Sequence, residues 1–201
     1  MTDTEREGYT TKELTAETLR DFEKLFETHP APGAFRCWCM YHHQSGSGGD
    51  VELDHPRVGM AKGNRERKRD LVRNDRSHGI LVYWEGEPVG WCQYGLMDEL
   101  PRFDGSRGYR RPVQSESHER LWRITCFTVD RRYRRRGVAR AALKAALEGI
   151  RRRGGGVVEA YPIVSWGAYR EYLGTASMFR REGFEVASSF GKSNVIMRKT
   201  V

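Results

Sequence analysis

The sequence of 201 residues contains no long hydrophobic run and only four cysteines. No stretch approaches the roughly 20 apolar residues that a membrane-spanning helix needs. The first residues, MTDTEREGY, are too polar for a signal peptide. Four cysteines in a chain of this length do not indicate a disulfide framework, so we expect reduced thiols. Together these absences predict a cytoplasmic protein.

Basic residues outnumber acidic ones, 35 to 27, which gives a formal net charge of +8. A basic protein attracts polyanions, so nucleic acid, an anionic membrane face and phosphate-rich cofactors are all admissible partners on charge alone. The 38% of hydrophobic residues include five Trp, nine Tyr and eight Phe, enough for a substantial core. This length predicts a single domain over residues 1–201.

The most regular pattern lies in residues 122–161, which read as a strand, a tight basic loop, a helix and a second strand. Residues 122–129 are rich in β-branched and aromatic side chains, and residues 157–161 form another short apolar run. A strand–helix–strand unit of this length predicts an α/β fold in which the two strands are parallel. The apolar face of the predicted helix comprises Leu143, Leu147 and Ile150.

The loop before this helix is arginine-rich and places a glycine at the helix entry. The first N–H groups of a helix have no partner within the helix, and a glycine beside them lets an anion approach. Guanidinium groups around such a turn suit a pyrophosphate. A solvated basic turn before an ordinary helix is the alternative. The residues of the loop are Arg131, Arg132, Arg134, Arg135, Arg136, Gly137, Val138, Ala139 and Arg140.

The pattern Arg134-x-x-Gly137-x-Ala139 resembles the acetyl-CoA-binding signature of the GNAT superfamily of N-acetyltransferases, Arg/Gln-x-x-Gly-x-Gly/Ala. The resemblance covers residues 80–199, with a hairpin over 80–94 and a last helix that runs into a Gly-Phe strand near residue 183. The motifs CWCM, CFTV and EAYP are also similar to a group of bacterial GNAT proteins whose substrates are mostly unassigned.

This resemblance implies an α/β GNAT (acyl-CoA N-acyltransferase) fold, a mixed central sheet flanked by helices. Residues 1–79 would supply an N-terminal strand, helices and a variable acceptor-side segment, and residues 80–199 the acetyl-CoA-binding core. Backbone N–H groups of the core strand would polarise the thioester carbonyl. Acetyl-CoA would be held by Phe127, Thr128, Val129, Arg134, Arg135, Arg136, Gly137, Val138, Ala139 and Arg140.

The family often carries a tyrosine as general acid at the position that is Phe179 here, and phenylalanine cannot donate a proton. We therefore predict that the acid is Tyr172 or Tyr161, with Tyr169 as a further candidate. We predict that the base is Glu159, with Glu99, Asp98 or a water held by one of these carboxylates as alternatives. Each of these residues could instead be a hydrogen-bonded core or rim residue. Direct transfer needs no covalent intermediate, so Cys126 on the core strand is not expected to be a nucleophile.

The segment Cys37-Trp38-Cys39-Met40-Tyr41-His42-His43 has the composition of a zinc site. Its Cys-x-Cys spacing is too short for the usual ligand pair, and a second pair is missing, so we expect no metal. We predict instead that aromatic residues here and in the insertion at 162–174 form a wall for an amine substrate. They could also cap the core or make a subunit contact. The predicted substrate-binding residues are Trp38, Tyr41, Trp166 and Tyr169.

The predicted function is transfer of an acetyl group from acetyl-CoA to a primary amine, of a small molecule because no stretch reads as a peptide-recognition surface. One alternative is acetylation of a protein N-terminus or lysine. Another is a non-catalytic protein that holds CoA or RNA. The basic segment at 57–74 reads as a solvated face without an RNA-binding signature, so neither nucleic acid nor a membrane is an expected partner. A homodimer is left open.

Overall fold

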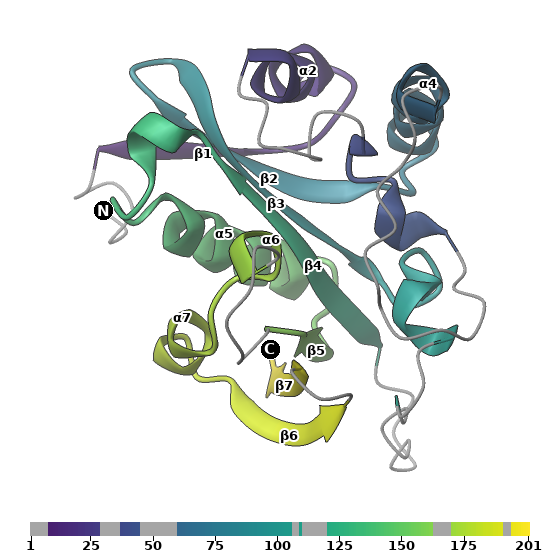
Figure 1. Ribbon diagram of the computed structural model, residues 1–201, viewed down its shortest axis with the longest axis vertical. Helices are drawn as coiled ribbons and strands as arrows, with labels where there is room; N and C mark the ends of the chain where they lie inside the picture. Colours follow the sequence, from purple (N-terminus) through teal and green to yellow (C-terminus); the bar gives the residue numbers. More distant parts are fainter. Residues whose placement is uncertain are drawn as a thin grey trace.

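The computed structural model describes residues 8–28, 37–44, 60–105, 109, 120–162, 170–190 and 194–201. Its seven strands form one mixed sheet flanked by helices (Figure 1), which confirms the predicted fold class. In sheet order the strands are β1 (Tyr9–Glu13), β2 (His78–Trp84), β3 (Glu87–Leu96), β4 (Leu121–Val129), β5 (Val157–Ala160), β7 (Asn194–Thr200) and β6 (Glu185–Phe190).

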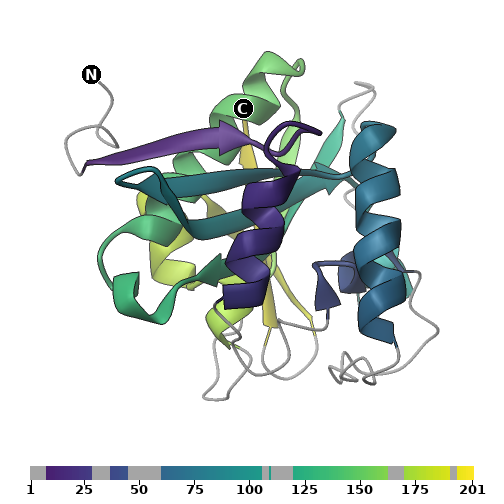
Figure 2. The ribbon, with the colours of Figure 1, turned by 90° about the horizontal axis from the view of Figure 1, so that it is seen from above.

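The helices cover both faces of the sheet. Helices α2 and α4 lie side by side on one face, as both views show (Figures 1 and 2), while α5 lies on the other. The helices are α2 (Leu19–Thr28), α4 (Met60–Arg73), α5 (Val138–Arg152), α6 (Arg170–Leu173) and α7 (Ala176–Arg181), with 3-10 turns η1 (Tyr41–His43), η2 (Pro101–Gly105) and η3 (Arg131–Tyr133). Within these described residues, no helix combines the length and the apolar character needed to cross a bilayer.

The two larger of three hydrophobic clusters lie one on each face of the sheet. Under α5, the buried residues Leu143, Leu147 and Ile150 pack against β2, β3 and β4, and Phe179 of α7 joins the same cluster. Under α2, Phe22 and Phe26 pack against Trp91 of β3 and its neighbours. The helical periodicity of the sequence therefore marks the faces that the helices bury.

The predicted hairpin is confirmed: β2 and β3 pair antiparallel around a two-residue turn. Glu85 and Gly86 both have left-handed backbones, with φ of 50° and 82°. Two consecutive positive φ angles match the twist of the flanking strands and give a tight hairpin. This pair of strands places β3 beside β4, the strand that leads into the arginine-rich loop.

All neighbouring strands are antiparallel except β4 and β5, which α5 connects as a crossover helix. Strand β5 pairs only with the first half of β4, from Leu121 to Ile124. At that point β4 carries a bulge, because Gln93 pairs with Cys126 while Tyr94 pairs with Ile124, and Thr125 is the extra residue. The second half of β4 thus runs beyond its pairing with β5.

Candidate active site

The turn after β4 is fixed by Asp130, which is 1% exposed. Its carboxylate accepts hydrogen bonds from the backbone N–H of Arg132 at 3.0 Å and from the Arg132 guanidinium at 2.8 Å. The Tyr9 hydroxyl of β1 donates to the Arg136 carbonyl at 3.0 Å. The loop is therefore anchored at its start and at its end, and the arginines between project from a defined backbone.

Gly137 lies directly before α5 with φ of 88°, a left-handed conformation that favours glycine. The first hydrogen bond within the helix runs from the Ala141 N–H to the Gly137 carbonyl at 2.9 Å, so the N–H groups before Ala141 have no acceptor inside α5. Because glycine has no side chain to cap them, this helix end presents partial positive charge to its surroundings.

A cleft of about 530 Å³ opens at this helix end, between the second half of β4, the arginine-rich loop and the segment that joins α6 to α7. Nine of the ten predicted acetyl-CoA residues line it. The exception is Arg136, which is exposed and has its guanidinium 5.9 Å from the Tyr133 ring centre. The lining residues are Phe127, Thr128, Val129, Tyr133, Arg134, Arg135, Gly137, Val138, Ala139, Arg140, Tyr172, Gly174, Thr175 and Met178.

Four lining residues were not predicted: Tyr133, Gly174, Thr175 and Met178. Gly174 has φ of 74°, and a Cβ there would lie 2.8 Å from Met178 and 3.1 Å from the Phe127 ring, so only glycine fits. The Thr175 hydroxyl accepts the Met178 N–H at 3.2 Å and caps α7. A Gly-Thr pair before a helix is a recognisable start signal, but nothing in it indicates which cleft the pair lines.

Charge and polarity in the cleft favour an anionic ligand with hydrogen-bonding groups. Arg135 is exposed at its edge, and the Arg134 side chain reaches the Val129 carbonyl at 3.4 Å. The hydroxyl of Thr128 is buried and finds no hydrogen-bond partner within the part of the chain that the structure describes. An orphaned hydroxyl in a cleft wall is a group that a bound ligand can satisfy.

The profile of the acetyltransferase (GNAT) family matches residues 38–174, which is more than half of the chain. The match includes every residue that lines the cleft except Thr175 and Met178. The chain belongs to the GNAT acetyltransferase family. It is therefore an acetyltransferase, and its cosubstrate is acetyl-CoA. The narrower bacterial group with CWCM, CFTV and EAYP motifs stays a prediction.

Solved structures share the fold at low identity. The GNAT domain of S. lividans PAT aligns with a TM-score of 0.56 and 14% identity over 95% of this chain and 89% of that chain. A PaiA N-acetyltransferase from Thermoplasma acidophilum, in complex with coenzyme A, aligns with a TM-score of 0.50 and 11% identity over 96% and 99%. The ribosomal-protein-S18-alanine N-acetyltransferase from Escherichia coli gives 0.50 and 12% over 96% and 94%. No curated protein sequence gives a significant match.

The predicted acid Tyr172 lies in α6 and lines the cleft of this GNAT protein. Phe179, at the position where the family often has a tyrosine, is fully buried. Its ring packs edge-on against Phe127 at 6.0 Å and Phe184 at 5.1 Å. A hydroxyl at that ring position would enter an apolar cluster, so the absence of a tyrosine is consistent with the packing around α7.

Glu159 and Tyr161 lie elsewhere, in a buried network outside the cleft lining. The Glu159 carboxylate accepts hydrogen bonds from Tyr161 at 2.6 Å, Tyr109 at 2.8 Å and Arg198 at 2.7 Å, and it is 0% exposed. Burial raises the pKa of the Tyr161 phenol well above its ordinary value. The structure thus brings Tyr172 to the cleft but not the other two predicted catalytic residues.

The four predicted substrate-binding residues have different placements. Trp38 is 5% exposed, stacks on Phe26 at 5.9 Å and carries the Arg65 guanidinium 5.0 Å above its ring. It packs in the hydrophobic cluster under α2, and its role as a substrate wall stays a prediction. Tyr41 is half-buried, with the Arg102 guanidinium 4.3 Å from its ring centre. Trp166 and Tyr169 lie outside the described residues.

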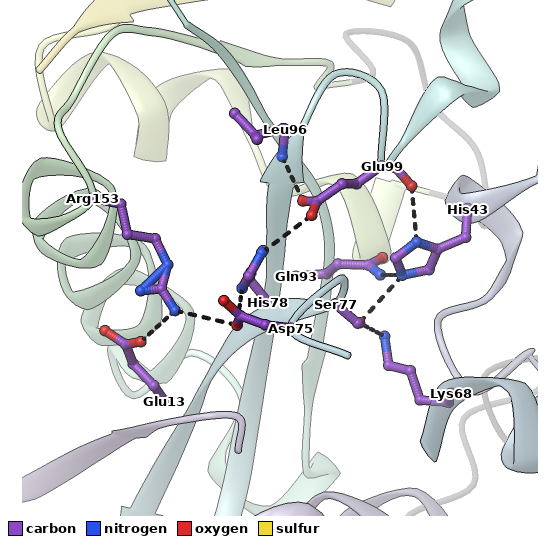
Figure 3. A network of polar contacts seen from close by, with 10 residues as sticks. All are labelled: Glu13, His43, Lys68, Asp75, Ser77, His78, Gln93, Leu96, Glu99 and Arg153. Atoms are coloured by element: carbon purple, nitrogen blue, oxygen red, sulfur yellow. Dashed lines mark hydrogen bonds and ion pairs between the residues drawn. The ribbon is translucent and has the colours of Figure 1, made fainter. Parts of the chain in front are cut away.

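His43, one of the side chains considered as a zinc ligand, has other partners. His43 Nδ1 is 2.8 Å from the Glu99 carbonyl, an acceptor, so Nδ1 carries the proton and Nε2 accepts from Gln93 at 3.0 Å (Figure 3). Burial and the charge of Lys68 lower the pKa of His43 to about 2, so it is neutral. Among the described residues, no three potential ligands gather around one point.

Proposed function

We propose that this acetyltransferase moves the acetyl group of acetyl-CoA to a primary amine of a small molecule, by direct attack of the amine on the thioester. The observation that carries the proposal is the coincidence of three features in one cleft. These are the glycine-opened helix end at Gly137, the arginines beside it, and the stretch of β4 that β5 leaves unpaired.

In this proposal the pyrophosphate of the cosubstrate lies against the N-terminus of α5, beside Arg134 and Arg135. The pantetheine arm follows residues 127–129 toward the bulge at Thr125, along a wall that is apolar at Phe127 and Met178. The buried hydroxyl of Thr128 would gain a hydrogen-bond partner from the amide groups of that arm. Binding would fix the thioester relative to β4 and reduce the entropic cost of reaction.

The chemical step requires polarisation of the carbonyl, loss of an amine proton and protonation of the leaving thiolate. Backbone N–H groups at residues 127–129 would stabilise the oxyanion, and Tyr172, in the cleft wall, would protonate the thiolate. The amine proton would leave through water. The described lining contains no Cys, Ser, Lys or His. Pairing with Cys39 and burial raise the pKa of the Cys126 thiol well above normal, which also favours direct transfer.

Release of free CoA thiol in the presence of candidate amines tests this proposal. Small primary amines and polyamines should accelerate release above the rate without an acceptor, whereas peptides with a free N-terminus or an internal lysine should not. Acceleration by peptides alone would overturn the small-molecule assignment and favour a protein acetyltransferase. Acetyl-CoA binding without release on any amine or peptide would overturn the proposed catalytic step.

A further inference from the structure

Two cysteines that are distant in the sequence lie next to each other on the face of the sheet that α2 and α4 cover. The sulfur atoms of Cys39, just before η1, and Cys126, in the second half of β4, are 3.4 Å apart. Cys39 is 3% exposed, and Cys126 is partly exposed. The two residues are separated by 87 positions, so only the folded chain brings their thiols together.

The surroundings of this pair stabilise negative charge on Cys39. The Trp91 indole N–H donates to Cys39 Sγ at 3.2 Å. Lys68, which is 1% exposed, lies nearby, with its ammonium 5.6 Å from the Trp91 ring centre and donating to Ser77 at 2.7 Å (Figure 3). Burial would raise the pKa of Cys39, but the Cys126 thiol, the Lys68 charge and the Trp91 N–H together lower it below its usual value.

Cys126 has the opposite tendency, because pairing with Cys39 and burial raise its pKa. Within the pair, Cys39 is therefore the sulfur that loses its proton more readily, and Cys126 is the one that keeps it. A thiolate in contact with a second thiol is the arrangement in which an oxidised sulfur is captured at once as a disulfide.

We propose that Cys39 and Cys126 form an oxidation site at which peroxides generate a reversible disulfide between η1 and β4. The Cys39 thiolate attacks one peroxide oxygen, the O–O bond breaks, and a sulfenic acid and a hydroxide form. The Cys126 sulfur then attacks the sulfenic sulfur, the S–S bond forms and the S–O bond breaks. The Cys126 proton and the solvent protons convert both oxygens to water, so two thiols lose two electrons to one peroxide.

Formation of the disulfide requires a small movement of the local backbone. The sulfurs must approach from 3.4 Å to about 2 Å. Trp38 and Cys39 both have φ of 51°, a left-handed conformation that non-glycine residues rarely adopt. This short segment is therefore held by its contacts rather than by local preference. A disulfide would join it to β4 one residue before Phe127, which lines the cleft.

The other two cysteines provide internal comparisons. The Cys37 sulfur accepts the Tyr41 N–H at 3.3 Å, and burial and the neighbouring Cys39 raise the pKa of Cys37 to about 11. Cys92 is 0% exposed and packs in the cluster on the opposite face of the sheet, under α5. Its burial raises its pKa well above normal. Neither thiol shares the geometry of the pair.

Peptide mapping of the full chain after brief exposure to hydrogen peroxide tests the proposal, with alkylation before digestion and no reductant. We expect a Cys39–Cys126 cross-linked peptide, loss of two titratable thiols, and recovery of both with dithiothreitol. Cys126→Ser should abolish the cross-link, Cys92→Ser should leave it unchanged, and Lys68→Met should slow its formation several-fold because the thiolate loses its cation.

Three results would overturn the proposal. These are a link that involves Cys37, oxidation of single thiols without a disulfide, and no reaction under conditions that oxidise a free cysteine peptide. Because the mapping is done on the unaltered protein, it does not depend on whether the serine variants fold. It also does not depend on acetyl transfer, so the oxidation site and the proposed function fail independently.

Discussion

Arg140 near the start of α5 donates from Nε to the Glu182 carboxylate at the end of α7, at 2.7 Å. The side chain of Glu182 is 12% exposed and that of Arg140 is 41% exposed. Arg140 lines the cleft, and α7 carries Met178, which lines it too. This ion pair therefore ties together the two helices that flank the proposed acetyl-CoA site, and it neutralises part of the positive charge there.

Replacing Glu182 with Gln should remove one negative charge beside Arg140 and raise the positive potential at the start of α5. Acetyl-CoA should then bind about two- to threefold more tightly, while the free energy of unfolding falls by at most about 1 kcal/mol, because the pair is partly exposed. Calorimetry and urea denaturation measure the two effects. Glu185→Gln, an exposed position in β6 with the same charge change, is the control. Weaker binding in Glu182→Gln would contradict this role.

Tyr172→Phe tests the predicted proton donor. If the phenol protonates the departing thiolate, kcat should fall by about 10²-fold while the Kd for acetyl-CoA stays within a factor of about two, since general acid catalysis contributes on that scale. Tyr133→Phe removes a hydroxyl from the same cleft wall and serves as the matched control. Equal, small effects of both variants on kcat would show that Tyr172 only lines the cleft.

Glu159→Gln tests whether Glu159 is a catalytic base or a buried structural residue. The carboxylate is fully buried and paired with Arg198, so removing its charge should cost about 3 kcal/mol of unfolding free energy. The rate per folded molecule should stay unchanged at a temperature where the variant is folded. Glu148→Gln on the exposed side of α5 is the control. A large loss of kcat without a loss of stability would restore Glu159 as a base.

The ion pairs of Glu23 should make the free energy of unfolding depend on pH. Burial opposes its ionisation, but Arg65 and Arg69, which bond to it at 2.7 Å and 2.5 Å, lower its pKa to about 2. The pKa of Glu23 is lower in the folded protein than in the unfolded chain. The ionised carboxylate therefore stabilises the folded state above about pH 4.5, and this contribution is lost as the pH falls toward 2. It should amount to about 3 kcal/mol at neutral pH.

Denaturation of Glu23→Gln across this pH range checks the prediction. The variant should lose stability less steeply than the unaltered protein between pH 4.5 and 2. Glu27→Gln, whose side chain contacts Arg65 but is 45% exposed, should behave like the unaltered protein. Identical pH profiles for all three proteins would contradict the assigned pairing.

Local patterns in the sequence predicted much of the fold. The periodicity of α5, the hairpin around Glu85 and the signature at Gly137 involve residues close in sequence, whose preferences act before any tertiary contact forms. The same signature predicted most of the cleft lining. The antiparallel pairing of β5 with β7 joins residues about 40 positions apart, and no local pattern in the sequence specified it.

Burial and long-range pairing account for what the sequence did not reveal. An aromatic residue such as Trp38 can line a pocket or fill a core, and the choice depends on the positions of Phe26 and Arg65. Likewise, Glu159 reads as a candidate base until Arg198 and Tyr109, from distant segments, occupy its oxygens. Side-chain identity indicated the available chemistry, and tertiary structure decided whether that chemistry could reach the cleft.

A calorimetric titration of acetyl-CoA into Gly137→Glu and its control tests the central claim most directly. Glutamate at 137 places bulk and negative charge where the pyrophosphate is proposed to lie. Gly86→Glu makes the same change at a left-handed turn glycine that has open space around it and does not line the cleft. We expect binding to the unaltered protein and to Gly86→Glu, and none to a folded Gly137→Glu. Equal affinity of all three would contradict the assignment of the cleft as the acetyl-CoA site.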